Sequence, residues 1–160
     1  MQIDSFDLHY LLHAASLVED RLRHRLADVG VSHSQARVID ALARMGAVSQ
    51  VTLAREFGVT PASMSTMTAR LIEAGFITRR VDPAEARSNI VDLTPKGREL
   101  LSDVHAAWRD IDTLIRDTMG ADDAVHLATL TRNLRDRLGG KAPGTGSDRR
   151  LKASKQNKTG

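Results

Sequence analysis

Apolar residues recur every three or four positions over most of the chain, which places them on one face of a helix. The first such stretch covers about residues 5–29 and is followed by Gly30, a typical helix terminator. Its apolar positions are Phe6, Leu8, Leu11, Leu12, Ala15, Val18, Leu22 and Leu26. Ser32 and Gln35 have the spacing of a capping box, so a second helix should begin there and end near Gly46.

Two shorter helices follow, separated by a tight turn. The first carries Leu53, Ala54 and Phe57 on one side, and Gly58 comes next, where a chain leaving a helix needs positive φ. Thr60 and Pro61 are typical of an N-cap and a first helical residue. The expected buried stripe of the second helix is Met64, Met67, Leu71 and Ala74. This order of helix, turn and helix is typical of a helix-turn-helix.

The opposite face of the second short helix is small and polar. Its outward positions are Ala62, Ser63, Ser65, Thr66, Ala69 and Arg70. Small side chains allow a helix to enter a major groove, where hydroxyls and a guanidinium can bond base edges or phosphates. We therefore take Ser63, Ser65, Thr66 and Arg70 as candidate DNA-binding residues. The alternative is an ordinary amphipathic helix with a solvated face.

A β-hairpin should come next. Residues 76–81 and 89–93 are rich in β-branched and aromatic residues, and the charged segment 82–88 between them contains a proline. Arg87 lies at the expected tip, where it could enter a narrow minor groove with concentrated negative potential. Alternatively, Arg87 pairs with Asp82 or Glu85 to hold the hairpin. The hairpin after two short helices completes a winged helix-turn-helix.

These residues resemble the multiple-antibiotic-resistance regulator (MarR) family of bacterial transcription factors. The resemblance covers roughly residues 6–138 and is strongest at 71–79, 82–87 and 91–97. It implies a homodimer with interlocking terminal helices and two winged lobes that bind a pseudo-palindromic operator, often released by a small ligand. Repression is the commoner outcome in the family.

Carried over residue by residue, the resemblance puts Ser63, Ser65, Thr66 and Arg70 on the recognition helix and Arg87 on the wing. Many relatives carry Arg or Lys near Thr66, whereas the first half of this helix has no charge. Specificity should therefore depend partly on DNA shape rather than on one dominant contact with guanine.

The long terminal helices favour dimerisation. A further helix should start at Thr94 and Pro95 and end before Gly120, and a last one should cover about residues 122–138. The first and last helices are more apolar than one small lobe can cover, and a homodimer would bury them. The alternative is that they pack on each other within one chain.

Charge is unevenly distributed along the 160 residues, whose net charge is +3. Residues 1–138 hold 17 basic and 19 acidic residues, whereas residues 139–160 hold six and one. Glycine and proline recur at the start of this last segment, without a periodic apolar face, so we expect a disordered basic tail. Residues 1–138 should form a single domain, with the winged helix-turn-helix at about 32–98 and dimerisation helices at about 5–29 and 95–138.

Several classes of protein are disfavoured by what the sequence lacks. No run of about 18 apolar residues suggests a membrane span, and no export signal is visible, so we expect a cytoplasmic protein. With no cysteine, the chain has no disulfide or thiol switch. No catalytic or phosphate-binding motif appears, so we expect neither an enzyme nor a cofactor. His9 and His13 lie one turn apart, but they lack further ligands, and we expect no metal site.

A small-molecule effector is a further partner implied by the resemblance. Family members can bind small aromatic acids or other amphipathic molecules between the dimer base and the winged lobe. The candidate lining residues are His9, Leu12, His13, His33 and Trp108. The alternative is that they are ordinary packing or surface positions.

The expected fold is mainly α with a small β-hairpin wing, a winged helix-turn-helix with long terminal dimerisation helices. The expected function is sequence-specific binding of double-stranded DNA by a homodimeric transcriptional regulator. The resemblance implies that this regulator is a repressor. The alternative is a winged-helix module for protein association, which should instead expose apolar anchors on its second short helix.

Overall fold

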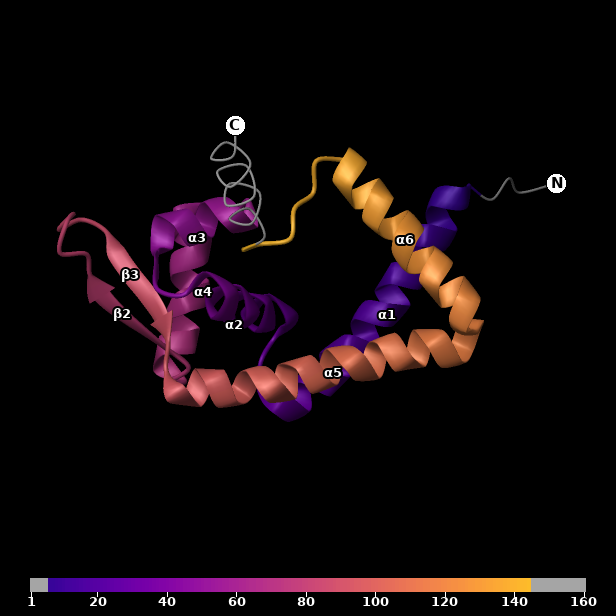
Figure 1. Cartoon of the computed structure of the whole chain (residues 1–160), viewed down its shortest axis with the longest axis horizontal. Coiled ribbons are helices and arrows are strands. Elements are labelled where there is room, and N and C mark those ends of the chain that lie inside the picture. Colours follow the sequence, from indigo (N-terminus) through magenta and orange to yellow (C-terminus); the bar gives the residue numbers. More distant parts are fainter. Residues whose placement is uncertain (1–5, 145–160) are drawn as a thin grey trace, which may run out of the picture.

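A computed structural model describes residues 6–144, over which the chain forms six helices and a three-stranded sheet (Figure 1). The helices are α1 (Asp7–Val29), α2 (His33–Met45), α3 (Gln50–Phe57), α4 (Pro61–Glu73), α5 (Pro95–Met119) and α6 (Ala121–Arg137). The strands are β1 (Val48–Ser49), β2 (Ile77–Val81) and β3 (Asn89–Leu93). The mainly helical fold with a small β wing is confirmed.

The winged lobe consists of α2, α3, α4 and the sheet. The strands are antiparallel in the order β1-β3-β2, and β2 and β3 form the wing. β1 pairs Val48 with Val91, a short third strand that the sequence pattern did not indicate. The fully buried side chains Ile39, Leu53 and Leu71 come from α2, α3 and α4, and together with Val91 they form the centre of the core.

The ends of the short helices are held by the predicted caps. Ser32 and Gln35 form the capping box of α2 in both directions. Gly58 ends α3 in the left-handed region, at φ 62°. The Thr60 hydroxyl accepts a hydrogen bond from the Ser63 amide at 3.1 Å, and Pro61 opens α4. Local sequence signals thus set the angle at which α4 leaves the turn.

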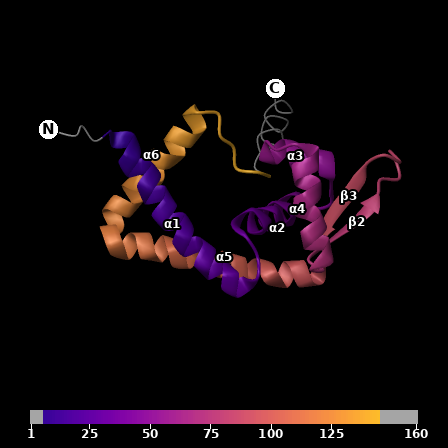
Figure 2. The same cartoon turned by 180° about the vertical axis from the view of Figure 1, so that it is seen from behind.

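The base of the molecule is formed by α1, α5 and α6. α5 runs beneath the winged lobe and continues to the base, so it joins the two parts (Figures 1 and 2). α1 packs along α5, and Arg25 on α1 donates to Asp110 Oδ2 on α5 at 2.9 Å. α6 has no buried residue within the chain.

One detail of the predicted burial is wrong. Ala74, expected in the buried stripe of α4, is the C-cap that follows the helix and is exposed. Thr68, for which the sequence pattern made no prediction, is fully buried. The Thr68 hydroxyl donates to the Met64 carbonyl at 2.9 Å, which satisfies the polar group and allows its burial. Met64, Thr68 and Leu71 therefore form the inward side of α4.

The segment after α6 also differs from the expected disordered tail. Residues 139–144 are placed against the winged lobe, and the Pro143 side chain is buried. The Gly144 amide donates to Glu56 Oε2 on α3 at 3.2 Å. Pro143 and Gly144, which we expected only to interrupt helical structure, instead contact the winged lobe. Residues 145–160 of the expected tail lie outside the described residues.

Candidate nucleic-acid interface

The outward face of α4 presents short polar side chains and one guanidinium. Ser63, Thr66 and Arg70 are exposed, whereas Ser65 lies on the flank of the helix and is half-buried. The Thr66 hydroxyl donates to the Ala62 carbonyl at 3.2 Å, which leaves the oxygen able to accept from a base edge. The structure therefore brings four of the five predicted DNA-binding residues together on one helix, with Ser65 the least accessible.

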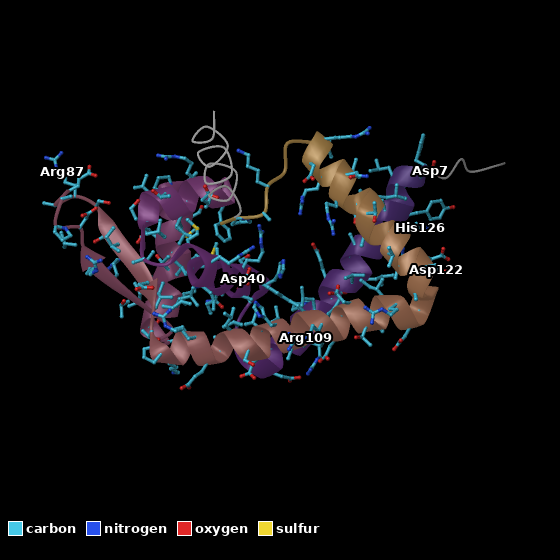
Figure 3. The ribbon with its side chains drawn as sticks, viewed as in Figure 1. Asp7, Asp40, Arg87, Arg109, Asp122 and His126 are labelled. Carbon is cyan, nitrogen blue, oxygen red and sulfur yellow. The ribbon has the colours of Figure 1, made fainter. Side chains whose placement is uncertain are left out.

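The wing tip is held by its backbone and by Asp82. The Asp82 amide donates to the Ser88 carbonyl at 2.8 Å, and Asp82 Oδ1 accepts from the Ala84 amide at 2.9 Å. Arg87 is exposed at the tip and has no ion-pair partner among the described residues (Figure 3). The alternative pairing with Asp82 or Glu85 is not formed, so the guanidinium is available to an external anion.

Further unpaired positive charge lies on β2. Arg79 and Arg80 are both exposed, and neither has a carboxylate partner within residues 6–144. Arg79 lies opposite Val91 in the strand register, and Arg80 lies opposite Ile90, so the two side chains leave opposite faces of the hairpin. In contrast, Arg23 and Arg25 in the base are paired with carboxylates. The charge distribution of the winged lobe is suited to phosphate.

A groove of about 390 Å³ separates α4 from the start of α2. Its lining residues are Ser32, Ser34, Gln35, Ser63, Thr66, Met67 and Arg70. Sequence reasoning did not include Ser34 among the candidate DNA contacts. The signal that could have indicated it is the capping box at Ser32, because the first turn of a helix presents backbone amides that favour anions.

The far end of α4 is fastened to α5. Lys96 Nζ donates to the Ala74 carbonyl at 2.9 Å and lies 4.9 Å from the centroid of the Phe76 ring. The Thr94 hydroxyl donates to the Gly75 carbonyl at 2.7 Å and accepts from the Gly97 amide at 3.0 Å. These bonds join the end of the recognition helix, the wing and the start of α5, so movement of α5 relative to α4 is restricted.

Two of the five predicted ligand-lining residues share a cavity of about 470 Å³ between the base and the lobe. His33 and Trp108 line it, and their ring centroids are 6.5 Å apart. The other lining residues are Val18, Leu22, Arg37, Asp40, Arg44, Ile111, Asp112, Ile115, Arg135, Lys141, Ala142 and Pro143. His9, Leu12 and His13 are exposed near the start of α1 and do not line it.

Polar side chains connect α2 with α5 beside this cavity. Asp40 on α2 accepts from Arg44 and lies 2.8 Å from Nε2 of His105 on α5 (Figure 3). Burial lowers the pKa of His33 below the ordinary 6.5, and the nearby Arg37 lowers it further, against a smaller opposite effect of Glu19. The Trp108 indole N–H is buried without an acceptor among the described residues.

Within residues 6–144, histidine and carboxylate side chains form no group of three or more that could hold a metal ion. The helices described there include none that is long and apolar enough to cross a membrane.

The fold and the polar face of α4 define a winged helix-turn-helix protein, and comparison with known proteins identifies its family. The MarR family model matches residues 29–88. An uncharacterised HTH-type transcriptional regulator of Mycobacterium bovis is 35% identical over 118 residues, which cover 74% of this chain and 75% of the relative. An HTH-type transcriptional repressor of Mycobacterium tuberculosis is 27% identical over 113 residues, 70% of this chain and 81% of that one. The chain belongs to the MarR family of transcription regulators.

Solved structures agree with this assignment at the level of the fold. A crystal structure of MarR superposes with a TM-score of 0.73 at 21% identity, covering 86% of this chain and 94% of that one. A cysteine-to-serine mutant of MarR from E. coli complexed with operator DNA gives 0.69 at 21% identity, covering 79% and 92%. The curated relatives are transcription regulators, so the expectation that the protein is not an enzyme is confirmed.

Proposed function

We propose that this protein is a homodimeric, sequence-specific DNA-binding regulator that represses transcription from a two-fold operator. The observation that carries the proposal is the outward face of α4, where Ser63, Thr66 and the unpaired Arg70 are exposed together. In helix-turn-helix proteins the second helix enters the major groove with its amino-terminal residues on base edges. Repression is supported by the name of the mycobacterial repressor among the relatives.

The two parts of the interface have different tasks in this proposal. Hydroxyls at Ser63, Ser65 and Thr66 bond base edges in the major groove, each with modest discrimination. Arg70 at the helix and Arg87 at the wing supply charge, and Arg87 enters the flanking minor groove. The absence of large apolar side chains from the exposed face of α4 favours DNA over a protein partner.

Dimerisation is supported by apolar surface on the terminal helices. On α6, Leu127 is 36% exposed, Leu130 66% and Leu134 45%, and the three share one face of the helix. On α1, Leu8 and Leu12 are each 57% exposed. A continuous face of this kind is larger than a soluble monomer usually shows, and a second copy would bury it. The dimer would then present two winged lobes related by a two-fold axis.

A small-molecule effector would bind in the cavity beside His33 and Trp108. Its walls combine apolar side chains with charged groups of both signs, and Arg37 has no ion pair within residues 6–144, so an amphipathic acid could find a cationic partner there. The cavity lies between α5 and α2, so a ligand could change the orientation of the lobe relative to the base. Such a change would alter the spacing between the two recognition helices of a dimer.

The experiment is a selection of bound duplexes from a random pool with the full chain, followed by titration of the selected sequence. We expect a two-fold consensus with half-sites about 10 base pairs apart, as the geometry of dimeric helix-turn-helix proteins requires. Arg70→Ala should weaken binding, whereas Arg109→Ala should not, because Arg109 is an exposed arginine on α5 that has no ion-pair partner within residues 6–144 (Figure 3). Recovery of no consensus would favour the protein-association alternative.

A further inference from the structure

The chain turns back toward the winged lobe after α6. The Gly139 amide donates to the Asp136 carbonyl at 3.1 Å, and the Gly140 amide donates to the Arg135 carbonyl at 2.8 Å. A Cβ at Gly140 would lie 2.6 Å from Arg135 Cγ and 3.0 Å from the Arg135 carbonyl oxygen. The turn therefore requires a residue without a side chain at Gly140. It directs residues 139–144, which we call the strap, across to α2 and α3 (Figure 1).

The end of the strap is seated on the lobe by specific contacts. Gly144 has φ +78°, and a Cβ there would lie 3.2 Å from Met45 Cγ on α2. Its amide donates to Glu56 Oε2 on α3 at 3.2 Å. Pro143, the preceding residue, is buried. Backbone conformation, close approach and a charge-assisted hydrogen bond thus all fix the same position.

The middle of the strap forms one wall of the cavity beside Trp108. Lys141, Ala142 and Pro143 line it, together with Arg135 from the end of α6. The opposite walls come from α1, α2 and α5, including His33 and Trp108. Any molecule that reaches Trp108 from the side of the strap must therefore pass these residues.

We propose that the strap is a lid that restricts access to the cavity and ties α6 to the winged lobe. Opening would break the hydrogen bond between the Gly144 amide and Glu56 and expose the Pro143 ring, which costs far less than unfolding of the lobe. An open strap would expose the cavity and release the lobe from α6. The lid therefore links entry of a ligand to movement of the winged lobe relative to α6. Only the effect of this movement on DNA binding rests on the proposed function.

Trp108 is the only tryptophan of the chain, so its fluorescence reports on the lid directly. We would measure its emission maximum and its quenching by acrylamide, a small neutral probe, in three chains. The full chain and a chain ending at Gly144 should behave alike. A chain ending at Leu138, which lacks the strap, should emit at longer wavelength and show a larger quenching constant. Equal quenching in all three would overturn the proposal.

Point variants in the full chain keep the test decisive if the shorter chain fails to fold. Gly144→Val places a β-branched side chain at positive φ against Met45, and Glu56→Ala removes the acceptor of the Gly144 amide. Both should increase quenching of Trp108 while circular dichroism stays unchanged. Glu99→Ala is the matched control, because Glu99 is an exposed glutamate on α5. Quenching of the two variants at the level of this control would contradict the lid.

The outcome is separable from that of the proposed function. Fluorescence quenching involves no DNA, so a failure of the lid prediction would not count against duplex binding. Conversely, a chain that bound no duplex could still show the predicted response of Trp108. The same variants can then be titrated with a selected duplex. The lid predicts weaker binding for Gly144→Val, because a smaller fraction of the orientations of a released lobe is competent to bind DNA.

Discussion

Gly97 lies directly against the backbone of Phe76, so closely that a Cβ at Gly97 would meet the Phe76 carbonyl oxygen at 2.1 Å. This contact brings the first turn of α5 onto the segment between α4 and β2. The same junction contains the hydrogen bonds of Thr94 and Lys96 to the carbonyls at the end of α4. The orientation of the recognition helix relative to α5 therefore depends on the absence of a side chain at Gly97.

Gly97→Ala should lower the free energy of unfolding. In an open helical position the change would stabilise by about 1 kcal/mol, because alanine has the higher helix propensity. Here the new methyl group meets backbone atoms that cannot move alone, so we expect a net loss of about 1–3 kcal/mol. Urea unfolding followed by circular dichroism measures the change, with Glu99→Ala as the control on the same helix. A stabilised variant would show that the junction is not tightly packed.

Arg87→Ala should weaken binding to every duplex, with the largest loss where the flanking minor groove is narrow and A·T-rich. The slope of log affinity against log salt concentration should become shallower by about 1, because fewer counterions are released. Titrations at several salt concentrations measure both effects, and Arg109→Ala provides a change of equal charge on α5. If affinity and slope matched those of the control, the wing would be structural only.

Charge placed on the apolar face of α6 should separate the dimer. Leu130 and Leu134 are exposed in the single chain, and each would contribute about 1.5–3 kcal/mol on full burial. The double change Leu130→Glu and Leu134→Glu should therefore sediment as a monomer at micromolar concentration. Arg132→Glu, on the opposite face of the helix, should leave the dimer intact. A stable monomer of the unchanged chain would contradict dimerisation through α6.

Stability should fall as the pH decreases through the range in which His33 titrates in the unfolded chain. The folded-state pKa of His33 is lowered, chiefly by burial, so between that value and 6.5 the unfolded chain binds more protons. The contribution is fully present above 6.5 and is lost as the pH falls through the lowered pKa. His33→Gln should reduce this slope in urea unfolding measured across the range. An unchanged slope would show that other groups cause it.

Local sequence signals predicted the helix-turn-helix well because its geometry is determined locally. A hydroxyl at Thr60, a proline at Pro61 and a glycine at Gly58 each act within a few residues, and the structure has them in the expected roles. Likewise the β-branched and aromatic residues of the wing strands and the turn at Asp82 act within the hairpin itself.

The differences from the prediction have two sources. Ala74 was expected on the buried side of α4, but the helix ends at Glu73 and Ala74 is exposed, whereas the Thr68 hydroxyl donates to a carbonyl of its own helix and packs inside. The pairing of β1 with β3 joins residues more than forty positions apart, and no local pattern indicates it.

The cavity shows the same limit. Trp108 and His33 were predicted to line a ligand site, and both do line a cavity, but His9, Leu12 and His13 lie elsewhere in the chain. The walls come from several helices whose packing is not encoded in any short segment. The contribution of residues 141–143 could not be predicted, because Pro143 and Gly144 are read as breaks in structure until Met45 and Glu56 are placed beside them.

The central claim is that α4 reads the operator within a two-fold dimer, and tethered DNA cleavage tests it most directly. The chain has no cysteine, so Thr66→Cys gives a unique attachment point for an iron chelate that cuts nearby DNA. On a selected duplex we predict two cleavage clusters related by a two-fold axis and about 10 base pairs apart, with Arg87→Cys cutting outside them. Scattered cleavage, or a single cluster, would contradict the account.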